Sequence, residues 1–439
     1  MSYKKRKTSR IKVKRSDDKV SESAERGKKS KNIAMKRSVS PSRKLNREKT
    51  RGEKPTDDGA RYIHVIEGSK LKNQKRRRRS LIAAAVVAVL IAAVLAVNAI
   101  LPTGLVEWSQ NLFSAMGSGG GLPVQVSGDK VDDLRGRGGE LFVMSDSYMY
   151  AYNSSGKQIT SVQHGYSSPR LEVSSTRTLI YDRGSYGLRV DALYTNFIDT
   201  QLNNKIITAD ICDRGYVAVA TDSSDYSAEV TVYSDKFKSL FRWSAASGQV
   251  TSLKLSPRGK YLAASVVSGK NGDYCSEISI FDIQTGARVF TKEYAGSMFV
   301  KSYADKNCVT FVGIDSTVSF KWDGTGERSN DYYRLEYFDG SDPENMVAVY
   351  HPDGDDRRFT VAVIGTDGAS KGSFTVDGDA GKVCADSENV YTYYNGVINK
   401  YDFSGSKLDS FSTGCEYVYI AAYKNGVAAT HDMKLDFYS

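Results

Sequence analysis

The side chains that could perform acid–base or metal chemistry in this 439-residue chain are few and widely separated. His164, His351 and His431 lie far apart in sequence, so that only a fold closing on itself could bring them together. Turns at 351–357 and 377–379 are rich in Asp, and Ca²⁺ prefers oxygen ligands. Neither turn supplies the roughly six to eight converging oxygens of a calcium site, and Asp-Gly is also a common hairpin turn. We therefore expect no metal and no cofactor.

Most known catalytic motifs are missing from the sequence. It contains no P-loop and no His-Glu-x-x-His, and Gly-x-Ser-x-Gly occurs only once, at 368–372, next to a Gly-containing turn phrase at 364–368. Its three tryptophans are too few for the docking motifs of a quinone-dependent dehydrogenase. Asp182-Arg183 and Asp210 are candidates for an axial channel, should the fold form one. The prediction is a protein that is not an enzyme, with an enzyme of the propeller class as the alternative.

Five scattered cysteines form no Cys-x-x-Cys pair, which is unlike a zinc site or a disulfide-stapled domain. They are expected to be small buried residues. One disulfide, for example Cys384 with Cys415, stays open because sequence alone does not give its geometry.

Charge is distributed very unevenly along the chain. Residues 1–80 contain 29 Lys/Arg and 9 Asp/Glu, whereas the remainder contains 32 and 42. Residues 1–60 lack apolar periodicity and are predicted to be a disordered, basic, cytoplasmic tail. Such an arm fits an anionic lipid surface or a cytoplasmic partner. Nucleic acid is disfavoured, because the tail lacks aromatic residues for stacking on bases.

A short apolar run interrupts the polar sequence within residues 61–80. It consists of Tyr62, Ile63, His64, Val65 and Ile66. Such a β-branched and aromatic run could add as a strand to the sheet of a partner. The alternative is chance apolar content in a disordered segment.

Residues 81–101 are 21 uncharged residues, long enough at 1.5 Å per residue to cross a hydrocarbon core of about 30 Å. A basic cluster precedes them: Lys75, Arg76, Arg77, Arg78 and Arg79. The positive-inside rule then places the N-terminus in the cytoplasm and the C-terminal part outside the cell. The cluster would also contact anionic lipid. A cleaved signal peptide is the alternative, although its n-region would be unusually long.

Residues 102–121 connect this helix to the rest of the chain. Leu105, Trp108, Leu112 and Met116 repeat at helical spacing, and Trp108 suits an interfacial anchor. We predict a short interfacial helix followed by a Gly-rich linker.

From residue 122 to 439 the sequence consists of short alternating runs separated by turn signals, as in all-β folds. One phrase recurs, for example Tyr152-Asn-Ser-Ser-Gly-Lys157 and Tyr401-Asp-Phe-Ser-Gly-Ser-Lys407. It predicts the turn between the last two strands of a four-stranded repeat. Seven such units fit at 129–163, 168–202, 206–243, 249–294, 296–328, 333–376 and 380–412.

The two ends of this region together could form an eighth unit. Residues 416–437 suggest three strands and 122–126 a fourth, so that closure would remove the exposed sheet edges. We therefore predict a seven- or eight-bladed β-propeller, with eight favoured and a β-sandwich pair as the alternative. The phrase Ser256-Pro-Arg-Gly-Lys-Tyr-Leu-Ala263 resembles the blades of WD40-like and quinoprotein-like propellers.

The whole layout resembles a family of membrane-anchored propeller proteins, domain of unknown function 5711, of Gram-positive bacteria. The resemblance rests on the phrase at 62–68, the basic cluster, the apolar helix and the propeller. It implies a location in the bacterial envelope and brings no activity or catalytic residue. We expect the propeller to bind a protein or an envelope ligand, with a purely structural scaffold as a further alternative.

Overall fold

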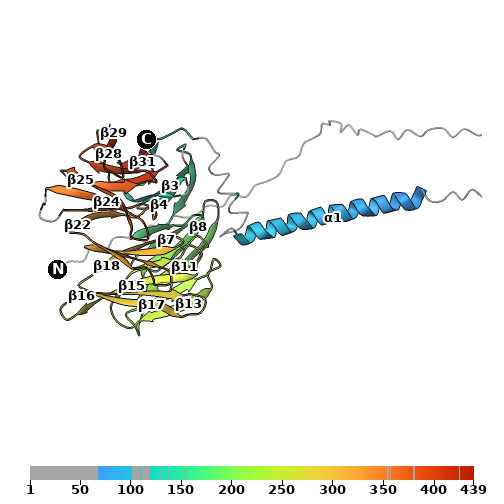
Figure 1. Cartoon of the computed structure of the whole chain (residues 1–439), viewed down its shortest axis with the longest axis horizontal. Helices are drawn as coiled ribbons and strands as arrows, with labels where there is room; N and C mark the ends of the chain where they lie inside the picture. Colours follow the sequence, from blue (N-terminus) through green and yellow to red (C-terminus); the bar gives the residue numbers. More distant parts are fainter. Residues whose placement is uncertain are drawn as a thin grey trace, which may run out of the picture. The chain divides into compact units, whose positions relative to one another are not determined.

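The computed structural model describes residues 68–100, 109 and 119–439, except 129, 138, 154, 353, 354, 356, 379, 380 and 425. The strands of residues 119–439 form eight four-stranded antiparallel sheets, the blades of a β-propeller (Figure 1). In each blade we label the strands a to d from the central channel outward. The predicted all-β propeller is thus confirmed, with eight blades.

The first four blades follow the chain order. Blade 1 consists of β2 (Val131–Arg137), β3 (Glu140–Ser145), β4 (Tyr148–Asn153) and β5 (Gln158–Gln163). Blade 2 consists of β6 (Pro169–Val173), β7 (Arg177–Asp182), β8 (Gly187–Ala192) and β9 (Asn196–Gln201). Blade 3 consists of β10 (Ile206–Ile211), β11 (Val217–Thr221), β12 (Ala228–Tyr233) and β13 (Ser239–Ala245). Blade 4 consists of β14 (Gln249–Leu255), β15 (Tyr261–Lys270), β16 (Asp273–Asp282) and β17 (Arg288–Ala295).

The next three blades continue in the same way. Blade 5 consists of β18 (Phe299–Ala304), β19 (Cys308–Gly313), β20 (Ser316–Lys321) and β21 (Arg328–Asp331). Blade 6 consists of β22 (Leu335–Asp339), β23 (Met346–Tyr350), β24 (Arg358–Ile364) and β25 (Ser370–Asp377). Blade 7 consists of β26 (Lys382–Ala385), β27 (Asn389–Tyr394), β28 (Val397–Asp402) and β29 (Lys407–Ser412). All seven agree with the predicted repeat units within a few residues.

Blade 8 joins the two ends of the propeller region. Its strands a to c are β30 (Tyr419–Tyr423), β31 (Gly426–His431) and β32 (Lys434–Tyr438), and its strand d is β1 (Val124–Gln125). Val124 pairs with Leu435, and Gln125 pairs with Lys434. The predicted closure is confirmed: β1 supplies the fourth strand of blade 8, and β30 lies against β2 of blade 1.

Apolar residues fill the spaces between neighbouring blades, because the two faces of each sheet pack against the sheets on either side. Seven of the eight neighbouring pairs share a cluster of buried apolar side chains. The described residues form no such cluster between blades 5 and 6. There the hydroxyl of Thr310 donates to the Thr366 carbonyl at 2.8 Å, and that of Thr366 donates to Asp305 Oδ2 at 2.8 Å. We call this hydrogen-bonded interface the polar seam.

The recurring sequence phrase forms the turn between strands c and d, as predicted. In blade 4, the backbone amides of Thr285 and Gln284 donate to Asp282 Oδ1 at 2.9 and 3.0 Å. These hydrogen bonds hold the pKa of Asp282 below its ordinary value. Gly286 then adopts φ 73°, a conformation that glycine reaches without steric cost.

The connections divide the propeller into two faces. The a–b and c–d connections share one face, here called the c–d face, and the b–c and d–a connections share the other, here called the b–c face. The chain reaches the propeller at the c–d face, where the amide of Gly119 donates to Ser155 Oγ at 2.8 Å and that of Gly121 donates to the Ser155 carbonyl at 2.9 Å. Ser155 lies in the c–d turn of blade 1.

Helix α1 (Gly68–Ile100) contains the predicted apolar segment and begins before it. The basic residues preceding that segment also favour helix, which explains the longer element. By length and composition, Arg78–Val97 could cross a membrane or serve as a signal sequence. The predicted tail 1–60 and the interfacial helix lie outside the described residues, apart from Ser109.

Candidate functional site: a charged channel and a tyrosine-bearing face

The a strands surround the central channel and bring charged residues to one level. Glu172, Asp210, Lys254 and Tyr303 are each the penultimate residue of β6, β10, β14 and β18. Because the a strands all begin at the b–c face and end at the c–d face, equivalent positions stand at the same height. Four consecutive blades therefore place polar side chains side by side around the channel.

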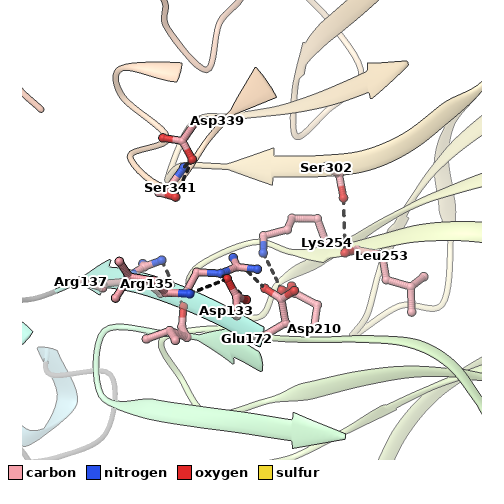
Figure 2. A network of polar contacts seen from close by, with 12 residues as sticks. Asp133, Arg135, Arg137, Glu172, Asp210, Leu253, Lys254, Ser302, Asp339 and Ser341 are labelled. Carbon is pink, nitrogen blue, oxygen red and sulfur yellow. Dashed lines mark hydrogen bonds and ion pairs between the residues drawn. The ribbon is translucent and has the colours of Figure 1, made fainter. Parts of the chain in front are cut away.

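On the side of blades 1–4 these charges form ion pairs (Figure 2). Lys254 Nζ lies 2.5 Å from Asp210 Oδ1, and Asp210 Oδ2 accepts the amide of Leu255 at 2.7 Å. Arg135 Nε lies 3.0 Å from Asp133 Oδ2, and its Nη1 lies 3.9 Å from Glu172 Oε2. Asp210 is almost fully buried, whereas the other side chains keep some exposure to the channel.

Burial and charge act in opposite directions on these groups. Burial lowers the pKa of Lys254, but Asp210 and Glu172 outweigh it, so the pKa lies above the ordinary value. Burial raises the pKa of Glu172, and the positive charges of Arg135 and Lys254 only partly oppose this. The lysine is therefore held in its charged form, whereas Glu172 takes up a proton more readily than a carboxyl in water.

The side of blades 5 and 6 is arranged differently. Asp339 Oδ1 accepts hydrogen bonds from Ser341 Oγ at 2.7 Å and Ser341 N at 3.3 Å. Asp339 Oδ2 is buried without a partner, and burial raises the pKa of this carboxyl. Tyr303 stacks on Phe338 with ring centroids 5.7 Å apart, and burial raises the pKa of its hydroxyl. Figure 2 shows Asp339 and Ser341 across the channel from the ion-paired group.

Between the two sides lies a cavity of about 180 Å³, here called the channel cavity. It shares lining residues with a wider hollow of about 510 Å³ at the c–d face. Several carboxylates at this mouth accept backbone amides of the a–b turns, either of their own blade or, for Asp213, of the neighbouring blade through the Ser175 amide at 2.8 Å. Asp305 Oδ1, for example, accepts the amides of Asn307 and Cys308, both at 2.7 Å. These hydrogen bonds hold the a–b turns.

The b–c face presents exposed aromatic and apolar side chains on several blades. Tyr186, Tyr226 and Tyr274 lie in or beside the b–c connections of blades 2, 3 and 4, with Tyr394 at that of blade 7. Their exposed fractions are 38, 50, 53 and 50%. Three further exposed side chains of this face are Ile314, Tyr333 and Val418. Toward the c–d face, Tyr194 is similarly exposed, and the other exposed side chains stand at the starts of d strands: Phe197, Leu240, Val289 and Leu408.

The structure does not bring the three propeller histidines together, because each lies in a different part of the ring and bonds locally. Nε2 of His164 lies 3.2 Å from the Ser145 carbonyl. Nε2 of His351 lies 3.3 Å from Glu336 Oε1, and Nε2 of His431 lies 2.9 Å from Asp436 Oδ2. Within the described part of the chain, no group of three His, Cys, Asp or Glu side chains could hold a metal ion. All five cysteines are free thiols, so Cys384 and Cys415 are unpaired.

Other predicted residues are placed as follows. Asp210 lies in the channel as expected, but the expectation for Asp182 is wrong. Asp182 ends a b strand and accepts the Ser168 amide at 2.7 Å, away from the channel lining. Residues 62–66 and Trp108 lie outside the described residues. The cluster 75–79 belongs to α1, where Arg78 and Arg79 are exposed.

Sequence reasoning missed the ring of Glu172, Lys254, Tyr303 and Arg135. The sequence does contain a signal for these residues. Each lies at or near the penultimate position of the first strand of its blade, and Glu172 and Lys254 are each flanked by two apolar residues.

Comparisons with known proteins agree with the architecture. The family described as "Family of unknown function (DUF5711)" matches residues 125–436. No curated protein sequence matches the chain. Among solved structures, a computationally designed protein, Ika8, is 14% identical with a TM-score of 0.51, covering 72% of this chain and 99% of its own. BamB from Moraxella catarrhalis is 12% identical with a TM-score of 0.48, covering 72% of this chain and 100% of its own. These likenesses concern the fold alone.

Proposed function

Because the chain belongs to the DUF5711 family, whose function is unknown, we propose a function from its own surfaces. We propose a single-pass membrane protein whose propeller lies outside the cell and docks a protein partner on its b–c face. It would act by binding rather than by catalysis. The exposed tyrosines Tyr186, Tyr226, Tyr274 and Tyr394 carry this proposal.

Tyrosine suits such a surface for a physical reason. Its ring offers a large, rigid contact at little cost in conformational entropy, and its hydroxyl forms hydrogen bonds. Interfaces are enriched in tyrosine, and a few aromatic residues usually contribute most of the binding free energy. Since the chain joins the propeller at the c–d face, the b–c face is the one free of this connection.

Helix α1 supports the proposed topology, because it contains an apolar segment with a basic cluster at its N-terminal end. Residues 78–97 are long enough to cross a bilayer, and the basic cluster 75–79 overlaps only the N-terminal end of this span. The cluster would contact anionic lipid, with about 1 kcal/mol for each nearby Lys or Arg. Residues 62–66 would then face a cytoplasmic partner.

Site-specific photocrosslinking in whole cells tests the b–c face. A benzophenone amino acid replaces Tyr186, Tyr226 or Tyr394 in turn, and Tyr194 on the c–d face serves as the control, since it is similarly exposed. We expect the same protein at several b–c positions and not at Tyr194. Binding of that purified protein to the full chain should weaken at least about tenfold in Tyr226→Ser, or about 1.4 kcal/mol, and stay unchanged in Tyr194→Ser.

Three outcomes would contradict the proposal. The tyrosine variants could bind the captured protein as tightly as the parent chain. The control position could capture it equally well. Crosslinked material that resists protease but is released by glycan hydrolysis would instead identify an envelope polymer as the ligand.

A further inference from the structure

The charged side chains that line the channel cavity are mostly basic. Both oxygens of the lining residue Asp210 are already engaged, one by Lys254 Nζ and the other by the Leu255 amide. Asp133 and Asp213, which pair with two of the basic residues, do not belong to the lining. The cavity therefore offers more hydrogen-bond donors than acceptors. Its charged lining residues are Arg135, Arg137, Lys254 and Lys301 against Glu172 and Asp210.

Three lining side chains keep donors without a partner among the described residues. Arg135 uses Nε for a carboxylate outside the lining, whereas its Nη atoms donate no hydrogen bond, and Nη1 lies 3.9 Å from Glu172 Oε2. Lys254 Nζ donates only one of its three N–H groups, to Asp210. The Tyr303 hydroxyl makes no hydrogen bond within the described part of the chain. The side chains of Arg135 and Lys254 are 32 and 22% exposed, so a ligand in the cavity can reach them.

These donors come from three blades and lie around one space. Arg135 belongs to blade 1, Lys254 to blade 4 and Tyr303 to blade 5. Burial raises the pKa of Glu172, and the charges of Arg135 and Lys254 both oppose that rise, so both cations lie near its carboxyl group. Burial also raises the pKa of Tyr303, and Arg135 opposes this rise, so the hydroxyl lies near the guanidinium. The three donors therefore approach the cavity from different sides.

We propose that the channel cavity binds a small tetrahedral oxyanion of the phosphate or sulfate type, held by Arg135, Lys254 and Tyr303. The guanidinium and the ammonium group supply charge-assisted hydrogen bonds, and the hydroxyl donates a third. The anion enters through the wider hollow at the c–d face. The inference is independent of the protein docking proposed for the b–c face.

The positions of the donors and the charge of the lining select this kind of ligand. A tetrahedral anion directs oxygens to all sides and can meet donors from three blades, whereas a carboxylate presents two oxygens in one plane. A cation would face the excess of basic lining residues. The space of about 180 Å³ holds a small anion together with bridging water molecules. Glu172 opposes the anion, because its carboxylate lies beside both cations.

Equilibrium dialysis of the full chain in non-ionic detergent tests the proposal, with radiolabelled sulfate as the probe. We expect saturable binding at one site per propeller. Unlabelled phosphate should compete as sulfate does, whereas acetate and chloride should compete at least about tenfold more weakly. The basic residues before position 80 also attract anions, but this attraction is the same in the parent and in propeller variants, so the site is measured from their difference.

Glu172→Gln gives the sharpest test, because it should strengthen binding. It removes the negative charge beside Arg135 and Lys254, and we expect sulfate to bind about tenfold more tightly. A variant that folds poorly would not gain affinity. The gain therefore separates the proposed site from a general loss of structure.

Two further variants remove donors. Arg135→Gln should weaken sulfate binding at least about tenfold, and Tyr303→Phe about threefold, because the first removes a charged donor and the second a neutral one. The matched controls are Arg242→Gln, an arginine of an outer strand that pairs with a carboxylate at 3.3 Å, and Tyr233→Phe, a tyrosine that stacks on a phenylalanine as Tyr303 does. Both controls should bind sulfate as the parent does.

A phosphate ester separates two sources of the same group. Competition by glycerol 3-phosphate as strong as that by phosphate would assign the site to phosphate esters, and its failure to compete would assign the site to the free ion. Circular dichroism and the melting temperature verify the fold of each variant. Absence of saturable binding at tens of millimolar sulfate, equal competition by acetate, or unaltered binding by both Glu172→Gln and Arg135→Gln would each overturn the proposal.

Discussion

The ion pair between Lys254 and Asp210 allows a sharp test of how the channel stabilises the propeller. Asp210→Asn keeps the shape of the side chain and an oxygen that can accept the Leu255 amide. It removes the negative charge 2.5 Å from the Lys254 ammonium. Lys254 then remains in a poorly solvated position with only Glu172 as a nearby carboxylate.

The expected loss lies between two known limits. Removing one partner of a fully buried ion pair costs about 3–5 kcal/mol, whereas exposed pairs contribute about 0–1 kcal/mol. The Asp210 side chain is 2% exposed and that of Lys254 is 22% exposed, so channel water screens the lysine in part. We expect Asp210→Asn to lower the free energy of unfolding by about 2–3 kcal/mol.

A double-mutant cycle measures the interaction itself. Lys254→Met removes the charge that Asp210→Asn leaves unpaired, so the double variant should lie within about 1 kcal/mol of the parent, with a coupling of at least about 2 kcal/mol. Urea unfolding of the full chain, followed by tryptophan fluorescence of Trp243 and Trp322, gives the values. A coupling below about 0.5 kcal/mol would refute the reasoning.

The pH dependence of the free energy of unfolding provides a second test of the same ion pair. The pKa of folded Lys254 is raised above its ordinary value near 10.5. Its contribution to stability is therefore complete below that value, and it is lost as the pH rises through the higher pKa of the folded state. The difference between the parent and Asp210→Asn should thus stay constant at neutral pH and shrink only in strongly alkaline solution.

Three further predictions follow from other residues. Asp339→Asn should raise the stability at pH 7 by about 1 kcal/mol, because burial raises the pKa of this carboxyl and the ionised form is disfavoured in the folded state. The parent should accordingly lose stability as the pH rises from about 4 to the folded pKa of Asp339, and the variant should not, as urea unfolding at several pH values would reveal. Gly136→Ala should lower the melting temperature, since its Cβ would lie 2.5 Å from the Ala422 carbonyl oxygen at the junction of blades 1 and 8, and an unchanged melting temperature would contradict this close contact. Serine in place of Arg76–Arg79 should reduce the fraction of chains with an externally accessible propeller, measured by protease added to wall-stripped cells; an unaltered fraction would show that these arginines do not set the orientation.

The blades and the apolar helix could be recognised from sequence because their signals are local. The c–d turns combine a glycine at positive φ with an Asp or Asn that accepts neighbouring amides, as at Asp282 and Gly286. Both features operate within a few residues, so their spacing reveals each blade without knowledge of its neighbours. Even the eighth blade followed from counting three strands at one end and one at the other.

The polar seam and the charged channel could not be recognised from the sequence, because they depend on residues from separate blades. Thr310 lies in a b strand and Thr366 in a c–d turn, and only the packing of blade 5 on blade 6 joins them. Asp182 and Asp210 were equivalent candidates in the sequence. The structure separated them, because one ends a b strand and the other lies in an a strand.

The sequence by itself determined an all-β repeat, its closure through the two ends of the propeller region, and one apolar helical segment with basic residues at one end only. Each of these follows from spacing along the chain, where period and turn chemistry act over a few residues. Only the tertiary structure decided which charges meet across the channel, which side of it keeps unpartnered groups, and which face carries the exposed tyrosines. The alternation of apolar and polar residues along a strand indicates which side chains share a face of the sheet. The closure of the ring decides which residues of other blades lie opposite them.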